Sequence, residues 1–310
     1  MMSWYGVLFS VIVFLGPLIS LSTSNWLLVW GGMELSLISL LPILNLAKSS
    51  IPVESAMKYF LVQASASAVI LITGLNIYML EGSEYLILIL FILGLILKLG
   101  VVPLHFWVIP VVKGLKYIHM AFLLGPLKIV PLMLLMTNMN LDSSIFLFLL
   151  VSSIGTVLLG ALLGNNMSSI RMMLGASSIS HSGWFLMGGL VGFMWIYFSI
   201  YMISLYVVLY YLKVYPSDNY LVSIFLFSLS GLPPFLMFPA KMMVLYSLLS
   251  MGLSPIVFSF FIISAIVSLN FYMKFSFSFV LSSSENQKNF GAGVMPGLLL
   301  MMGGFILFFI

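Results

Sequence analysis

The sequence predicts an all-α, polytopic membrane protein, and two observations carry that prediction. Hydrophobic residues make up 63% of the 310 residues and charged residues only 6%, and the mean hydropathy is +1.25. Soluble globular proteins contain about 45–50% apolar and about 25% charged residues. The apolar residues are also gathered into about eleven runs, each long enough for the roughly 20 residues that cross a bilayer. We therefore expect lipid to surround most of the chain.

The predicted transmembrane helices follow one another with short connections, and no hydrophilic segment is long enough to form a soluble domain. We expect helices at 4–21, 25–45, 56–79, 85–104, 119–136, 143–164, 172–192, 194–213, 220–250, 255–280 and 293–310. The run at 220–250 exceeds one span because glycine and prolines interrupt it after Ser230. A single membrane-embedded domain covering residues 1–310 is the predicted organisation.

The cations are distributed asymmetrically over the predicted loops. On the side of the N-terminus lie eight of the eleven Lys and Arg residues: Lys48, Lys58, Lys113, Lys116, Arg171, Lys213, Lys274 and Lys288. The opposite loops contain the acids Glu81, Glu84 and Asp142 and no cation. Cation-rich loops face the cytoplasm or its mitochondrial equivalent. A miscounted helix would have mixed the two sides, so this asymmetry supports the order of the spans.

Four charged residues lie within predicted spans: Glu34, Lys98, Lys128 and Lys241. An ionisable group at the bilayer centre costs roughly 2.5–3.5 kcal/mol on insertion scales, so such groups are usually functional. For Glu34, the structural alternative is neutralisation by burial or satisfaction by a neighbouring helix, and Lys128 lies too deep for its side chain to reach water easily. Lys98 lies nearer the inner face, where its side chain could instead reach up to water.

Glycine and proline break two of these spans beside a lysine. The helix-breaking residues are Gly100, Pro103, Gly231, Pro233 and Pro234. The first two follow Lys98 in the fourth span, and the other three precede Lys241 in the ninth. Interrupted helices at corresponding positions of two halves indicate an ion pathway. An offset of five helices predicts two inverted repeats, at about 4–136 and about 143–280, each with a broken fourth helix, followed by the final helix.

The remaining polar residues are less specific. His181 follows several serines in the seventh span, and it could either bond between helices or line a proton path. Gln63 and Ser67 are expected to serve helix packing. The absence of cysteine excludes iron–sulfur clusters, disulfides and thiol catalysis within this chain. The three histidines lack metal-ligand spacing, and the scattered cations do not form a nucleic-acid patch.

Buried lysines suit a proton relay because two opposing effects act on their charge. Desolvation disfavours the charged form, and a nearby carboxylate favours it. Moving or protonating Glu34 could therefore switch Lys98 between charged and neutral forms. A proton could then pass between lysines if water enters cavities around the helix breaks.

Five segments of the sequence also carry a family resemblance. In this order they are WGGMELSLISLLPIL, AMKYFLVQASAS, LKLGVVPLHFWV, SSISHSGW and GLPPFLMFPAK. They resemble the second-subunit family of mitochondrial NADH–ubiquinone oxidoreductase, an antiporter-like family within respiratory complex I. The resemblance extends over nearly the whole chain.

This resemblance implies a core membrane-arm subunit that moves protons from the matrix to the intermembrane space. Glu34 would pair with Lys98, Lys128 would pass the proton along the membrane plane, and Lys241 would feed the opposite face, with His181 as a further candidate. The resemblance implies the mitochondrial inner membrane, an N-terminus in the matrix, and contacts with other complex I subunits and membrane lipid. NADH, FMN, iron–sulfur clusters and ubiquinone are expected on other subunits, and no cofactor or metal in this chain.

Two other interpretations remain open at this point. A stand-alone cation/proton antiporter would have a related fold and similar buried lysines. A structural subunit that has lost pumping would gain nothing from intramembrane charges and helix breaks, which argues against it.

Overall fold

A computed structural model describes residues 4–45, 50–79, 85–138, 143–214 and 219–282, and these residues are helical apart from short turns and breaks. Among the described residues, seven helical segments are long and apolar enough to cross a membrane, and one of them, Tyr117–Asn138, comprises three consecutive helices. The expected all-helical membrane architecture is therefore confirmed. The predicted helix at 293–310 lies outside the described residues. The count of about eleven spans and the repeat relationship stay predictions.

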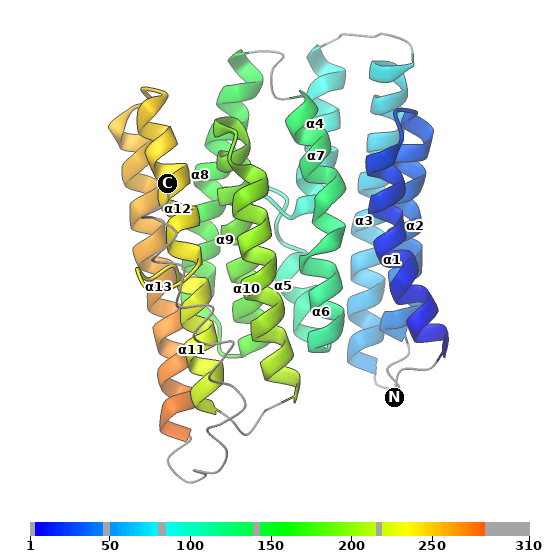
Figure 1. Ribbon diagram of the computed structural model, residues 1–310. Helices are drawn as coiled ribbons and strands as arrows, with labels where there is room; N and C mark the ends of the chain where they lie inside the picture. The colour runs from blue at the N-terminus through cyan, green and yellow to red at the C-terminus, as the bar shows by residue number, and fades with distance from the viewer. Residues whose placement is uncertain (1–3, 46–49, 80–84, 139–142, 215–218, 283–310) are drawn as a thin grey trace. The chain divides into compact units, whose positions relative to one another are not determined.

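The chain divides into two compact units, Met1–Leu149 and Leu150–Ile310. The first unit contains α1 (Trp4–Ser22), α2 (Trp26–Asn45), α3 (Ser50–Tyr78), α4 (Tyr85–Leu99), α5 (Val108–Gly114), α6 (Tyr117–Leu124), the 3-10 helix η1 (Pro126–Lys128) and α7 (Ile129–Asn138). Helix α8 (Ser143–Asn166) begins in the first unit, but most of its residues belong to the second unit. Figure 1 shows α1, α2 and α3 side by side, and α4 packs against α3.

The fourth predicted span is broken at the expected place. Helix α4 ends at Leu99, Gly100 adopts a φ of +70°, and the Val102–Pro103 peptide bond is cis. A positive φ is readily adopted only by glycine. The chain becomes helical again in α5, a short helix that the sequence analysis did not predict.

A further interruption divides the span predicted at 119–136. Helix α6 ends at Leu124, and η1 carries Lys128 before α7 begins. Proline has no amide hydrogen and clashes with the preceding turn, so Pro126 cannot continue α6 as a regular helix. The span predicted at 119–136 is thus present as one apolar helical segment, Tyr117–Asn138, whose regular α-helix is interrupted by η1.

The second unit contains the rest of α8, together with α9 (Ile170–Val191), α10 (Met194–Val214), α11 (Asn219–Ser230), α12 (Met237–Ser250) and α13 (Pro255–Ser282). Helix α11 packs against α13, and α10 contacts α9, α11 and α12. The break between α11 and α12 follows Ser230, as the sequence predicts. Gly231 there has a φ of +83° and precedes Pro233 and Pro234.

Candidate functional site

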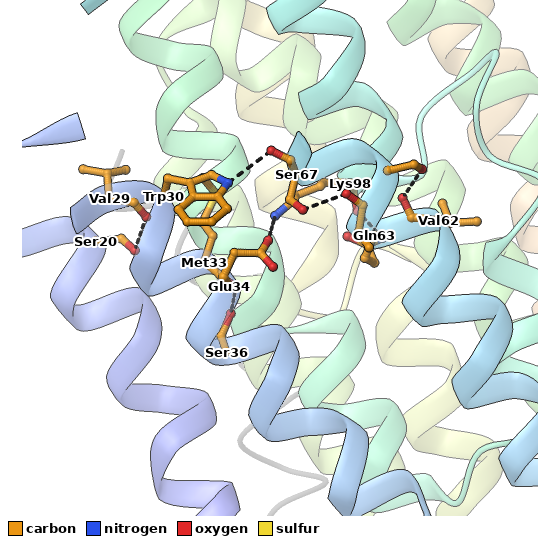
Figure 2. Close-up of polar contacts among 12 residues, drawn as sticks. Ser20, Val29, Trp30, Met33, Glu34, Ser36, Val62, Gln63, Ser67 and Lys98 are labelled. Carbon is orange, nitrogen blue, oxygen red and sulfur yellow. Dashed lines mark hydrogen bonds and ion pairs between the residues drawn. The ribbon is translucent and has the colours of Figure 1, made fainter. Parts of the chain in front are cut away.

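Glu34 and Lys98 form an ion pair in the first unit. The Glu34 carboxylate, midway along α2, lies 3.4 Å from the Lys98 ammonium in the last turn of α4. The side chain of Lys98 is only 5% exposed and that of Glu34 17%. Figure 2 shows the two side chains pointing toward each other. Lys98 therefore does not extend to the surface, which was the structural alternative.

Two carbonyl groups at the end of α4, beside the break, are in contact with side-chain donors. The Trp107 indole donates to the Leu97 carbonyl at 3.0 Å, and the same carbonyl also accepts from the Gly100 amide at 3.3 Å. The Gln63 amide donates toward the Lys98 carbonyl, 3.5 Å away; both residues are labelled in Figure 2. This contact joins α3 to α4, in keeping with the expected role of Gln63 in helix packing, but the sequence does not show that its acceptor is a carbonyl beside the break.

A second contact fixes α2 against α3. The indole of Trp30 donates to the Ser67 carbonyl at 3.1 Å, and Trp30 lies one turn before Glu34 (Figure 2). Because α3 also packs against α4, it lies between the helix that carries Glu34 and the helix that carries Lys98 and supports both.

A small cavity joins the two buried lysines of the first unit. Its volume is about 30 Å³. One water molecule needs about 10–15 Å³ of a volume measured in this way, so the cavity can hold about two water molecules. Its polar lining residues are Ser36, Tyr59, Gln63, Lys98 and Lys128. Because water needs two to four polar partners, this lining is suited to hydrated contact between the lysines.

Lys128 is buried on η1, immediately after the irregular turn at Gly125 and Pro126. Because of this turn, Lys128 lies in a short 3-10 helix instead of a regular α-helix. The Gly125–Pro126 pair is the sequence signal for this turn.

Lys241 lies in the second unit, in the second turn of α12 after the break that follows Ser230. It is buried, and its ammonium donates to the Ser230 carbonyl at 2.7 Å, at the end of α11. The Trp184 ring lies 5.8 Å from this ammonium, within the range of a cation–π contact. A Cβ atom on Gly231 would lie 3.0–3.2 Å from side-chain atoms of Lys241, so only glycine leaves full room for the lysine.

His181 lies within the same unit, between two tyrosine hydroxyls. Its Nδ1 is 2.9 Å from the Tyr197 hydroxyl, and its Nε2 is 3.4 Å from the Tyr272 hydroxyl. All three side chains are buried. His181 could be selected from the sequence because it lies in an apolar span. The two tyrosines could not, because they lie on other helices, α10 and α13, and the sequence does not show that they face His181.

Broken helices that carry buried lysines, one of them paired with an intramembrane glutamate, define the class of antiporter-like membrane proteins. Residues 23–215 match the family model described as NADH:quinone oxidoreductase/Mrp antiporter, TM. The chain belongs to this family.

Relatives that match over most of the chain are consistent with this membership. NADH-ubiquinone oxidoreductase chain 2 of Albinaria caerulea is 40% identical over 285 residues, covering 92% of each chain. The protein of the same name from Anopheles gambiae is 33% identical over 303 residues, covering 90% of this chain and 87% of the relative.

Solved structures show the same fold at low sequence identity. A chain of respiratory complex I from Thermus thermophilus superposes with a TM-score of 0.80 at 21% identity, over 98% of this chain and 79% of that one. A chain of the Mrp complex from a Dietzia species gives 0.73 at 18% identity, over 86% and 59%. The fold is thus shared by respiratory and antiporter assemblies.

Proposed function

We propose that this chain translocates protons in the membrane arm of an NADH:ubiquinone oxidoreductase. The relatives that carry this enzyme's name match nearly the full length of both chains, which supports the assignment. The single observation that carries the mechanism is the cavity shared by Lys98 and Lys128, with Glu34 paired to Lys98.

In this mechanism Glu34 controls the charge of Lys98. When the carboxylate is ionised and near, it stabilises the ammonium; when it is protonated or displaced, burial favours the neutral amine. A proton released from Lys98 then passes through water in the cavity to Lys128. Further transfer within the second unit uses Lys241, with His181 as an additional proton carrier.

The cellular setting follows from the same assignment. We place the chain in the mitochondrial inner membrane, with its N-terminus in the matrix, which agrees with the cation-rich loops on that side. The apolar side chains exposed along α1, among them Trp4, Leu8 and Leu18, supply surface for lipid or for other subunits of the complex. NADH, FMN, iron–sulfur clusters and ubiquinone would be bound by those other subunits.

The test is the Lys128→Ala variant in the assembled complex, reconstituted into sealed vesicles. We expect unchanged assembly and loss of proton pumping, because the cavity then has only one lysine. Lys213→Ala serves as control, since this lysine lies in the last turn of α10 at an exposed position. Normal pumping stoichiometry in Lys128→Ala would refute the relay.

A stand-alone cation/proton antiporter is the second candidate, favoured by the structural similarity to a chain of an Mrp complex. Native separation of mildly solubilised membranes distinguishes the two. Migration with a very large NADH-oxidising assembly supports the respiratory subunit, whereas migration as a small species without that activity supports the antiporter.

A further inference from the structure

Two tyrosine hydroxyls hold His181 from opposite ring nitrogens. Tyr197, on α10, lies 2.9 Å from Nδ1, and Tyr272, on α13, lies 3.4 Å from Nε2. The histidine itself is on α9, so three helices contribute to one continuous arrangement. All three side chains are at most 2% exposed, which removes bulk water as a competing partner.

The hydrogen-bond donors and acceptors of these three side chains can form a chain along which a proton is transferred. A neutral imidazole has one N–H donor and one acceptor nitrogen, and a tyrosine hydroxyl can both donate and accept. One tyrosine therefore donates to the bare nitrogen while the other accepts from the N–H. Ser177, one turn before His181, is a neighbour of Tyr272, and because its own hydroxyl donates to the Leu174 carbonyl at 2.9 Å, its oxygen can accept a proton from the Tyr272 hydroxyl.

We propose that Tyr197 and Tyr272 are the proton-transferring partners of His181, so that protons enter and leave the imidazole through these two hydroxyls. This inference rests on the proposed function, because it describes one segment of the same proton path.

The transfer balances in protons and charge. A proton reaching one tyrosine oxygen displaces that hydroxyl's own proton onto the bare nitrogen of His181. The proton on the other nitrogen passes to the second tyrosine oxygen, whose hydroxyl proton leaves in turn. One proton enters and one leaves, both tyrosines end neutral, and the imidazole ends with its proton on the opposite nitrogen.

Tyr201 provides a matched control on the same helix. Its ring lies 4.8 Å from the His181 ring, one turn after Tyr197. Its hydroxyl is buried and has no hydrogen-bonding partner among the described residues. Tyr201 thus contacts the imidazole through its ring alone, and losing its hydroxyl interrupts no chain.

The experiment compares Tyr197→Phe, Tyr272→Phe and Tyr201→Phe in the assembled complex in sealed vesicles. Each variant loses one oxygen and keeps its ring, so the stacking of Tyr197 on Trp184 is preserved. The rate of proton pumping is measured with NADH in H₂O and in D₂O. We expect Tyr197→Phe and Tyr272→Phe to slow pumping at least threefold and to increase the solvent isotope effect, and Tyr201→Phe to match the unmodified complex.

Two results would overturn the inference. The first is that Tyr197→Phe and Tyr272→Phe pump protons at the same rate as Tyr201→Phe. The other is slower pumping with an unchanged isotope effect, which is the behaviour of residues that only support packing. Lys128→Ala is measured in parallel: if it stops pumping while both phenylalanine variants pump normally, this inference fails and the proposed function stands. If Lys128→Ala also pumps normally, the proposed function itself fails.

Discussion

The Lys98 ammonium lies 3.4 Å from the Glu34 carboxylate, although 64 positions of the chain separate them. The pair forms because α2 and α4 both pack against α3. Helix α4 ends one residue after Lys98, and therefore the lysine is held at a helix terminus rather than within a regular helix.

Glu34→Gln should abolish coupled proton pumping. Breaking a buried ion pair costs about 3–5 kcal/mol because the remaining charge is uncompensated. The charged form of Lys98 then loses the partner that stabilises it, and the switch described above is lost. Pumping in vesicles and assembly on native gels are the measurements.

Glu54→Gln is the matched control for this variant. Glu54 pairs with Lys58 at 2.5 Å, but the side chains are 65% and 51% exposed. Exposed pairs contribute little, so pumping should be unchanged. Equal losses in the two variants would contradict a specific role for Glu34.

Gly231→Ala should impair pumping more than Gly192→Ala. Both glycines have a positive φ, +83° and +91°, so both substitutions share a backbone cost of about 1–2 kcal/mol. Only at Gly231 would the new Cβ approach Lys241, whereas nothing lies within 4 Å at Gly192. The comparison of pumping rates in the two variants isolates the displacement of Lys241, and equal rates would exclude it.

Gln63→Met should slow proton transfer between the two lysines of the first unit. The substitution keeps a similar volume, but it removes a polar group from the cavity wall and the contact with the Lys98 carbonyl. Water in the cavity would then have fewer partners. We expect a lower pumping rate with normal assembly, and Ser65→Ala, on the exposed side of α3, should pump normally.

Gly32→Ala should destabilise the packing of α1 on α2, whereas Gly31→Ala should not. A Cβ at Gly32 would lie 2.3 Å from the Ser20 hydroxyl and 2.6 Å from the Gly16 carbonyl. Overpacking of this kind typically costs about 1–3 kcal/mol. At Gly31 nothing lies within 4 Å. Thermal unfolding of the purified complex would show the difference, and a common melting temperature would contradict it.

The sequence predicted the elements of this fold better than their interruptions. Composition and the length of apolar runs indicate helices directly, and Pro233 with Pro234 marked the break after α11. The division of the span around Pro126 was missed, because prolines are tolerated in transmembrane helices and one proline does not reveal how the backbone responds.

The candidate site shows a similar limit. Glu34, Lys98, Lys128 and Lys241 could be selected because charge in an apolar run is costly wherever the helices lie. The contacts of Gln63 with the Lys98 carbonyl and of the tyrosines with His181 depend on helix rotation and on which carbonyls are freed. Neither property is encoded in local residue spacing.

The small size of the cavity between Lys98 and Lys128 bears on ion selectivity. A space for about two water molecules cannot admit a sodium or potassium ion with its hydration shell. A proton needs no such shell because it moves by exchange of hydrogen bonds, so in the proposed proton path a cavity of this size would favour protons over hydrated metal cations.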